Sequence, residues 1–367
     1  MYSFGYQQQM EEIDSLFYDS IDLLKRIIAI PSHSREEKEV ANVLEVYMQN
    51  CGLNPKRKEN NIWAISPDFD IKKPTILLNS HIDTVKPVDG WTVDPYQAIE
   101  SEGKITGLGS NDAGASVVSL LHAFIVLIKK EQSYNLIFLA SAEEEVSGKN
   151  GVECVLPELP PISFGLVGEP TGMNPAIAEK GLMVLDCCVR GQSGHAAREE
   201  GENAIYKAIP VINWFKSYQF PKQSDLLGKV KMSVTMIQSG TQHNVIPDLC
   251  TFVVDVRSNE CYSNAEILEI ITQNCGCEVK ARSTRLNSSN ISSNHPVVQR
   301  AVMLGKQPFG SPTLSDQALM PFPTLKMGPG QSSRSHTADE FVKTEEIREA
   351  IEIYIRILDK LECFSNF

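Results

Sequence analysis

The sequence predicts an α/β fold built on a mixed sheet, with a smaller ferredoxin-like α+β domain inserted into it. Three observations predict this fold. Apolar strand-like segments alternate with helical patterns before Lys180, which is typical of an α/β layer with mainly parallel strands. The order then changes to strand, helix, two strands, helix and strand, the split β-α-β pattern. An Asn/Ser-rich stretch at 287–294 reads as a linker. We therefore predict a discontinuous larger domain, residues 1–180 and 293–367, around an inserted domain, residues 181–292.

The elements of the larger domain follow from periodicity and turn residues. Helical periodicity covers 13–29 and 36–50, and we expect Ser34, ahead of acidic residues, to cap the second helix. A turn of small residues at 107–114 leads into an apolar helix at 115–130. The expected strands are 61–65, 75–79, 136–140 and one that ends near Gly168. Helical patterns resume after the linker at 296–304 and 345–361.

The inserted domain has its own alternation of strands and helices. Its expected strands are 182–189, 230–238, 249–256 and 278–284. Its expected helices are 203–215 and 265–273, and a polar glycine-containing turn lies at 191–198. A unit with this order can form a compact domain by itself.

Composition excludes several classes of protein. The chain of 367 residues is long for a single core, and its 42% hydrophobic and 22% charged residues are ordinary for a soluble globular protein. The net charge of −12 and the absence of a basic stripe argue against a nucleic-acid partner. Nine scattered cysteines without a Cys-x-x-Cys pair are typical of reduced thiols, not of a disulfide framework or a thiolate metal site.

Two segments bear on cellular location. Residues 1–12 are polar and lack the apolar core of a secretory signal. The longest apolar run, 117–128, is interrupted by His122 and is too short to span a bilayer, so we expect a buried helix. We therefore expect a cytoplasmic protein without a membrane partner.

Side chains able to bind a divalent cation follow several of the apolar strands and turns. His81 and Asp83 come directly after a strand and face the same way in an extended segment. A neutral imidazole is a good zinc donor, and a nearby carboxylate can fix its tautomer. The further candidates are Asp112, Glu144, Glu145, Glu169 and His336. Because the carboxyl ends of parallel strands meet at one edge of a sheet, these side chains can converge.

A count of charges favours two cations over one. Three carboxylate ligands (Asp112, Glu145 and Glu169) and one hydroxide carry −4, which balances two divalent cations. A single zinc ion would leave surplus negative charge in a partly buried place, at considerable cost. Two metals roughly 3.5–4 Å apart, bridged by Asp112 and a water, fit better.

Each candidate also has an ordinary structural interpretation. His81-x-Asp83 by itself is more often a surface pair, and Asp112 can cap a helix. The acidic run at 143–145 can be a solvated face, Glu169 can belong to a turn, and His336 can lie in a polar surface loop. The joint occurrence of all of them in this order favours a metal centre. A serine hydrolase of the α/β type is not expected, because the sequence has no Gly-x-Ser-x-Gly elbow.

Four short motifs together resemble a known family. They are His81-x-Asp83, Gly109-x-x-Asp112, Glu144-Glu145 and Glu169-Pro170-Thr171. They resemble the co-catalytic zinc aminoacylase and carboxypeptidase superfamily, which includes acetylornithine deacetylase, succinyl-diaminopimelate desuccinylase and glutamate carboxypeptidase. The resemblance covers nearly the whole chain. It implies a zinc-hydrolase catalytic domain with an inserted lid and dimerisation domain.

The resemblance implies the ligand set of two metal ions, Zn²⁺ or alternatively Co²⁺. Asp112 would bridge both ions. His81 and Glu169 would complete one site, and Glu145 and His336 the other.

The resemblance also implies roles for residues that do not bind the metals. Glu144 would be the general base, and Asp83 would orient the histidine ligand from outside the ligand set. Three consecutive glutamates, 143–145, make it ambiguous which one is the base and which one is the ligand. We match them to the family's order of an acidic residue followed by Glu-Glu, so that Glu143 is the first acidic residue, Glu144 the base and Glu145 the ligand. The chain departs from many relatives at Ala113, because Asp-Met-Lys-Gly or Asp-x-Lys-Gly is common there. That departure removes a lysine often found near the site.

The inserted domain offers three further candidates. His195, in Gly194-His195, matches the family's histidine that reaches across a dimer to the substrate carbonyl, although it can also be a turn histidine. Asn244, before Val245-Ile246-Pro247, matches a substrate-contacting asparagine, although asparagine is common in turns. Arg257 at a strand end can clamp a substrate carboxylate in two-pronged fashion, or can form a surface salt bridge.

The expected function is hydrolysis of the amide bond of an N-acyl amino acid by a homodimeric two-zinc enzyme. Acetylornithine, succinylornithine or acetylcitrulline, in arginine biosynthesis, is the preferred substrate, because the chain resembles the short deacylases. Succinyl-diaminopimelate desuccinylase and dipeptidase are alternatives in the same class. A metal-retaining scaffold without catalysis is the alternative from another class, and retention of Glu144 argues against it.

Overall fold

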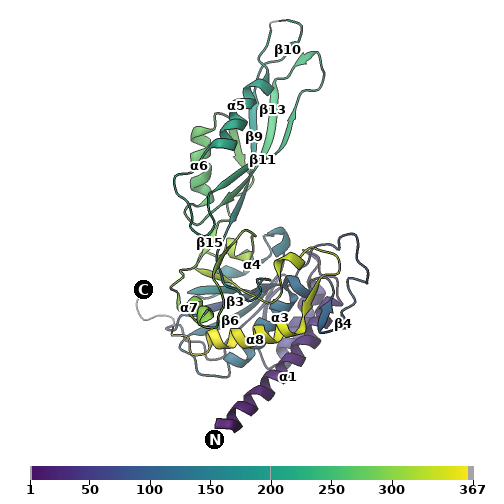
Figure 1. The fold of residues 1–367 in the computed structure, drawn as a ribbon, viewed down its shortest axis with the longest axis vertical. Coiled ribbons are helices and arrows are strands. Elements are labelled where there is room, and N and C mark those ends of the chain that lie inside the picture. Colours follow the sequence, from purple (N-terminus) through teal and green to yellow (C-terminus); the bar gives the residue numbers. More distant parts are fainter. Residues whose placement is uncertain (1, 199, 363–367) are drawn as a thin grey trace. The chain divides into compact units, whose positions relative to one another are not determined.

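The chain divides into two compact units (Figure 1). The computed structural model describes residues 2–198 and 200–362, with side chains from residue 14 on. Unit 1 comprises Met1–Ile177, Ile291–Phe309 and Ser315–Phe367, and unit 2 comprises Ala178–Asn290 and Gly310–Leu314. The inserted domain was predicted at residues 181–292, and the main segment of unit 2 is Ala178–Asn290. The side chains of the polar stretch 1–12, expected not to be a secretory signal, lie outside the described residues.

A mixed sheet forms the centre of unit 1, in agreement with the predicted fold class. Its strand order is β1-β2-β6-β3-β7-β17-β8-β15, with β16 paired to β8. β3 pairs in parallel with β6 and β7, and β17 pairs in parallel with β7, whereas the outer pairs are antiparallel. The strands are β1 (Lys56–Lys58), β2 (Asn61–Ile65), β3 (Thr75–His81), β6 (Asn135–Ser141), β7 (Phe164–Val167), β8 (Ala176–Glu179), β15 (Ser289–Asn290), β16 (Phe309–Ser311) and β17 (Thr324–Lys326).

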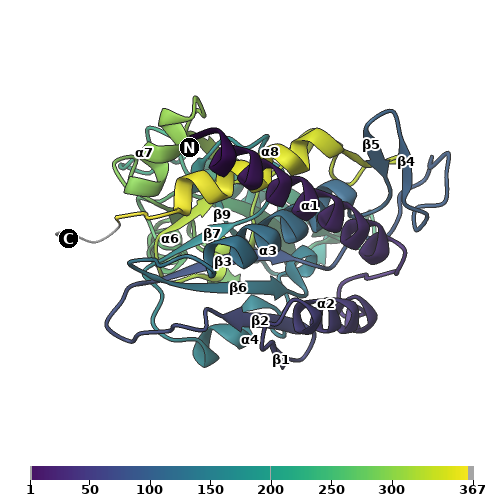
Figure 2. The same cartoon turned by 90° about the horizontal axis from the view of Figure 1, so that it is seen from below.

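Helices pack on both faces of this sheet, and α3 is the most deeply buried of them. α3 (Ala115–Leu127) lies on β3 and β6, and α1 (Tyr2–Ile28) and α8 (Thr344–Leu358) pack against it (Figure 2). The stretch Ser110–Leu127 is apolar and long enough to cross a membrane, but 94% of it is buried inside the fold, as expected for a core helix. The remaining helices of unit 1 are α2 (Lys38–Asn50), α4 (Val152–Val155) and α7 (Pro296–Met303).

A small sheet of three strands lies beside the central one. Its order is β18-β5-β4, with β4 (Ile99–Ser101), β5 (Lys104–Thr106) and β18 (Phe341–Lys343). None of these strands was predicted, because segments of three residues carry too little periodicity. In this sheet β5, which ends at Thr106, pairs with β18, which begins at Phe341. The pairing therefore holds the segment that follows residue 106 close to the segment that precedes residue 341.

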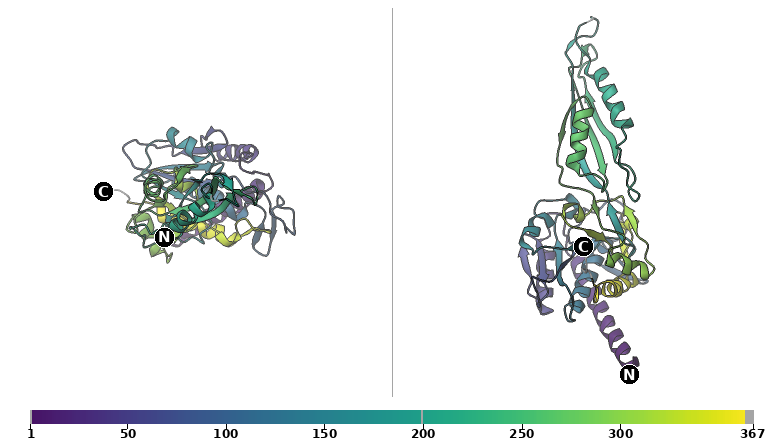
Figure 3. Two further views of the ribbon diagram at one scale, coloured as in Figure 1. Left: turned by 90° about the horizontal axis from the view of Figure 1, so that it is seen from above. Right: turned by 90° about the vertical axis from the view of Figure 1, so that its left-hand side faces the viewer.

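Unit 2 has the predicted strand and helix order. Its four-stranded antiparallel sheet runs β11-β13-β9-β14, and the helices α5 and α6 pack on it (Figure 3). The helices cover only one face of this sheet. Along β13, for example, buried side chains on the helix-covered face alternate with more exposed ones on the open face. The elements are β9 (Gly181–Arg190), α5 (Ala204–Ser217), β11 (Lys231–Ser239), β13 (Leu249–Ser258), α6 (Asn264–Asn274) and β14 (Glu278–Ala281). β10 (Gly194–His195) and β12 (Val245–Ile246) form a separate two-stranded ribbon.

Two local predictions were wrong. Ser34 does not cap α2, whose N-cap is Glu37, because the Ser34 hydroxyl instead donates to Asp83 Oδ2 at 2.7 Å. The strand expected at 75–79 continues to His81, because the polar residues Asn79 and Ser80 are buried in the sheet with partners for their side chains.

Candidate metal centre

Three parallel strands bring their carboxyl ends to one edge of the central sheet. β3 ends at His81, whose register partner is Ser141, the last residue of β6. β7 pairs with the other side of β3 up to Val167, and Glu169 follows shortly after. A short helical turn, Glu144–Val146 (η2), begins just beyond β6. Because these strands run in the same direction, the residues that follow them meet at this edge.

Two groups of three side chains each enclose a position for a cation. His81 Nε2 lies 3.1 Å from Asp112 Oδ1 and 3.7 Å from Glu169 Oε1. His336 Nε2 lies 3.0 Å from Glu145 Oε1 and 3.7 Å from Asp112 Oδ2. Within each group the ligand atoms lie within 4.8 Å of one another. Asp112 belongs to both groups through different oxygens, so the structure brings together every residue expected to be a ligand.

Asp112 is presented by a buried turn ahead of α3. The turn, Ser110–Gly114 (η1), follows Gly109, whose φ of 75° is a conformation that glycine adopts without strain. A Cβ on Gly109 would lie 2.6 Å from Thr84 Cγ2. The peptide bond from Asp112 to Ala113 is cis. Asp112 does not cap α3, whose N-cap is Gly114, so the ordinary helix-cap interpretation does not apply.

Asp83 supports the site in a way that the sequence did not predict. His81 Nδ1 hydrogen bonds to the Asp83 backbone carbonyl at 2.9 Å, and the Asp83 carboxylate lies farther away, at 3.5 Å. That carboxylate instead accepts the backbone N–H groups of Glu144 (3.0 Å) and Glu145 (3.1 Å). Asp83 therefore fixes the histidine through its backbone and the following glutamates through its side chain.

The three consecutive glutamates have distinct surroundings. Glu143 adopts a φ of 56°, and its carboxylate accepts hydrogen bonds from Asn150. Glu144 and Glu145 form a group with His81 whose ligand atoms lie within 4.8 Å of one another. Glu143 therefore lies outside the groups of candidate ligands, to which Glu144 and Glu145 both belong.

The acidic side chains of the centre repel one another. Burial raises the pKa of Glu169 to about 8, and repulsion from Asp112 adds to the effect. Burial also raises the pKa of Glu144 well above its ordinary value, and the nearby carboxylates Glu169, Asp316 and Glu145 contribute to this increase.

The pKa values of the two histidines are shifted upward by the neighbouring carboxylates. The hydrogen bond with Glu145 raises the pKa of His336 to about 9. Burial alone would lower the pKa of His81, but hydrogen bonds with Asp112 and Asp83 raise it well above its ordinary value.

This donor set fits two divalent transition-metal ions. It combines imidazole nitrogens with carboxylate oxygens, the ligand types of catalytic zinc sites. The mutual repulsion of the acids, visible in the raised pKa of Glu169, is the condition that bound cations relieve.

Unit 2 holds the three other predicted site residues. His195 and Val245 are register partners in the β10–β12 ribbon, and Ala196 N–H donates to the Asn244 carbonyl at 3.0 Å. The structure therefore brings His195 and Asn244 together on one ribbon. Arg257 lies at the C-terminal end of β13, where its guanidinium donates two hydrogen bonds to Asp255, at 2.9 and 3.2 Å.

Three buried polar residues beside the centre were not predicted. Asn111 hydrogen bonds to the loop that carries His336, and Glu340 hydrogen bonds to the loop that carries Asp112. Asp316 accepts the Ser141 hydroxyl at 2.6 Å, and its charge contributes to the raised pKa of Glu144. Their partners lie far away in the sequence, 175 residues or more, so no local pattern identifies them.

The model of peptidase family M20/M25/M40 matches residues 77–360. Succinyl-diaminopimelate desuccinylase from Corynebacterium glutamicum is 27% identical, over 94% of this chain and 97% of that protein. Acetylornithine deacetylase from Proteus mirabilis is 24% identical, over the same shares of both chains.

The solved structures include a dinuclear metal-binding peptidase of the M20 family from Bacillus subtilis. It superimposes with a TM-score of 0.71 at 16% identity, and the match covers 96% of this chain and all of that one. At this identity the likeness concerns the fold. Because the match covers 96% of this chain, it includes residues of both units.

Proposed function

Because the chain belongs to peptidase family M20/M25/M40, a family of metal-dependent peptidases and amidohydrolases, we propose that it hydrolyses the amide bond of an N-acyl amino acid. One observation carries this proposal. The two cation positions share Asp112, and Glu144, which belongs to neither proposed ligand set, offers a carboxylate oxygen within 4.8 Å of ligand atoms of His81 and Glu145. A scaffold that only bound metal would have no use for such a base, which argues against a non-catalytic role.

The proposed cofactors are two Zn²⁺ ions, with Co²⁺ as an alternative. His81, Asp112 and Glu169 would hold one ion, and Asp112, Glu145 and His336 the other. When bound, such ions would polarise the substrate carbonyl and lower the pKa of a bound water. Asp83 holds the Glu144–Glu145 backbone in place for this arrangement.

Glu144 is the proposed general base. It would take the proton from the attacking water and give it to the leaving amine nitrogen. Burial raises its pKa above the ordinary value, so this carboxylate takes up a proton more readily than an exposed glutamate does, as a general base requires. His195 is the proposed donor to the carbonyl oxygen, and Asn244, on the same ribbon, is a proposed substrate contact.

Arg257 is the proposed partner of a substrate carboxylate. Its guanidinium is paired with Asp255, so a substrate carboxylate would have to compete with that pair. An N-acyl amino acid carries the free carboxylate that this role needs.

The proposed substrate is acetylornithine, or alternatively succinylornithine or acetylcitrulline, which would place the enzyme in arginine biosynthesis. Desuccinylation of succinyl-diaminopimelate and dipeptide hydrolysis remain rivals, because the two relatives named above are similar to this chain to nearly the same extent. Parallel hydrolysis assays of these acylated amino acids and of dipeptides, on protein loaded with Zn²⁺ or Co²⁺, separate the candidates. Tight metal binding with no hydrolysis of any of them would favour the scaffold.

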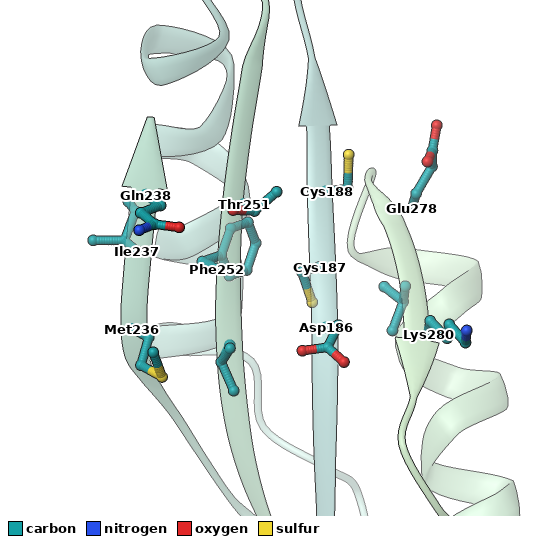
Figure 4. Close-up of a pocket in the computed structure, with 12 residues that line it drawn as sticks. Asp186, Cys187, Cys188, Met236, Ile237, Gln238, Thr251, Phe252, Glu278 and Lys280 are labelled. Atoms are coloured by element: carbon teal, nitrogen blue, oxygen red, sulfur yellow. The ribbon is translucent and has the colours of Figure 1, made fainter. Parts of the chain in front are cut away.

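We further propose a cytoplasmic homodimer that forms through unit 2. β11 is an edge strand, and an unpaired edge can accept a second chain. Its residues Met236 and Ile237 are 65% and 57% exposed, and Tyr206 and Ile209 on α5 are 71% and 50% exposed. Figure 4 shows Met236, Ile237 and Gln238 along the β11 side of a hollow of about 610 Å³ on this sheet. Light scattering of the wild type and of Ile237→Lys measures the association state, and a wild-type monomer would contradict the proposal.

A further inference from the structure

Two segments far apart in the sequence carry the ligands Asp112 and His336. The first, 107–112, precedes α3, and the second, 331–340, precedes β18. Each contributes one ligand to the same cation position, with His336 Nε2 3.7 Å from Asp112 Oδ2. The separation of these ligands therefore depends on what holds the two segments together.

The side chain of Asn111 joins the two segments from the first side. It is fully buried, and its Oδ1 accepts the backbone N–H of Gln331 at 2.9 Å. Its Nδ2 donates to the Gln331 carbonyl and to Ser335 Oγ, both at 3.1 Å. The amide thus binds both backbone groups of one residue and the side chain next to His336. The fit is close, because a Cβ on Gly330 would lie 2.2 Å from Asn111 Oδ1.

Glu340 joins the same segments from the second side. Its carboxylate accepts three backbone N–H groups, those of Gly109 (3.1 Å), Asn111 (2.8 Å) and Asp112 (2.9 Å). Its backbone carbonyl accepts the N–H of Gly107 at 2.9 Å. An ionised carboxylate offers only acceptors, so it is matched to a turn that presents three donors. A glutamine in its place would turn an NH₂ group toward at least one of these N–H groups.

Together these contacts form a two-sided clamp, which we define as the Asn111 side chain and the Glu340 carboxylate. We propose that this clamp holds Asp112 and His336 at the separation at which both can bind one cation, so that Asn111 and Glu340 are positioning residues of the metal centre. The proposal rests on the two-metal function proposed above. Groups outside the ligand set commonly change metal affinity by about 10–100-fold when they are removed.

The two halves of the clamp predict different effects. Asn111 acts between the segments, so Asn111→Leu should weaken by about 10–100-fold only the position shared by Asp112, Glu145 and His336. The position formed by His81, Asp112 and Glu169 should bind as before. Glu340 fixes the backbone of Asp112, which both positions use, so Glu340→Gln should weaken both.

Titration of metal-free protein with Co²⁺, followed by visible absorbance, measures both positions. Competition between Zn²⁺ and a chelator gives the two affinities independently. Asn135→Leu is a matched control. Asn135 is also a buried amide that binds backbone groups of a loop, at Asp70 and Lys73, but it lies at the opposite end of β6 from the metal centre. Thermal unfolding of each metal-free variant measures how far folding is affected.

The expected result is two tightly bound ions for the wild type and for Asn135→Leu, one for Asn111→Leu, and weakened binding at both positions for Glu340→Gln. If Asn111→Leu and Glu340→Gln lose thermal stability like the control and still bind both ions with wild-type affinity, the clamp has only a structural role and the proposal is wrong. Glu340→Gln has nearly the size of the natural residue, so it tests the clamp even if Asn111→Leu does not fold. A wild type that binds no ion, or binds two and hydrolyses nothing, would instead contradict the proposed function.

Discussion

His336 Nε2 lies 3.0 Å from Glu145 Oε1, although 191 residues separate them in the chain. The contact joins a loop after β6 to a loop before β18, on opposite sides of the inserted unit in the sequence. It completes the second cation position and raises the pKa of His336 to about 9.

Removal of His336 should therefore affect one cation position more than the other. In His336→Ala the second position keeps only the carboxylates of Asp112 and Glu145, so its affinity should fall by more than about 10-fold, which is over 1.4 kcal/mol. Treatment with a chelator should abolish hydrolysis in the wild type, and Zn²⁺ or Co²⁺ should restore it. The variant should need a higher metal concentration for the same recovery. Recovery at the same concentration would show that His336 is not a ligand.

Glu144→Gln should separate metal binding from turnover. The amide cannot accept the water proton, and loss of a general base typically lowers kcat by about 10²–10⁴-fold. Because Glu144 is not among the proposed ligands, the metal content should stay at the wild-type value. Metal analysis and kcat on the same preparation test both parts. Wild-type turnover in this variant would remove Glu144 from the mechanism.

Asp83→Asn should destabilise the site through the backbone. One carboxylate oxygen would become an NH₂ group facing the N–H of Glu144 or Glu145, and a buried donor without a partner costs about 1–3 kcal/mol. We expect a lower free energy of unfolding and lower turnover in the same variant. The Ser34→Ala variant removes a third hydrogen bond to the same carboxylate and should have a smaller effect. Equal stability of Asp83→Asn and the wild type in urea unfolding would contradict this interpretation.

His122 predicts a dependence of stability on pH. It is buried in α3, where its Nδ1–H donates to the Val118 carbonyl and its Nε2 accepts the Tyr47 hydroxyl. Burial lowers its pKa below the ordinary 6.5. Below about pH 6.5 the unfolded chain therefore takes up a proton that the folded chain does not, and stability falls as the pH falls, by at most about 1.4 kcal/mol per pH unit.

His122→Gln keeps an acceptor for Tyr47 but does not titrate. The free energy of unfolding in urea, measured from about pH 7.5 to 5.5, should therefore fall less steeply in this variant than in the wild type. The other histidines are the same in both proteins, so the difference in slope reports His122 alone. Identical slopes would mean that His122 is not protected from protonation in the folded protein.

Strong periodicity explains which parts of the fold the sequence predicts well. The strand at 61–65 is observed as Asn61–Ile65, and the order of elements in unit 2 also matches its prediction, whereas the first helix, predicted at 13–29, begins earlier, at Tyr2. Strands of two or three residues, such as β10 and β18, are not recognisable, because pairing with distant partners decides them. Ser34 shows the same limit, since its hydroxyl binds Asp83 in preference to a nearby helix end.

The ligands could be predicted because each follows an apolar strand or a glycine turn and belongs to a recognisable motif. The residues that hold those ligands could not. Asn111 bonds to Gln331 across 220 positions, and Glu340 bonds to Asp112 across 228. An asparagine before an aspartate or a glutamate before a strand has many ordinary uses, and only the three-dimensional arrangement distinguishes this one.

The insertion of unit 2 also sets the order in which the centre can form during synthesis. His81, Asp112, Glu145 and Glu169 all precede Ala178, where the inserted unit begins, whereas His336 follows it. A growing polypeptide that has reached Glu169 already contains every donor for one cation. The ribosome must then translate the whole inserted domain before the last imidazole emerges. The second position can therefore close only after His336 has been synthesised, so a product that terminates before His336 lacks a donor for the second ion.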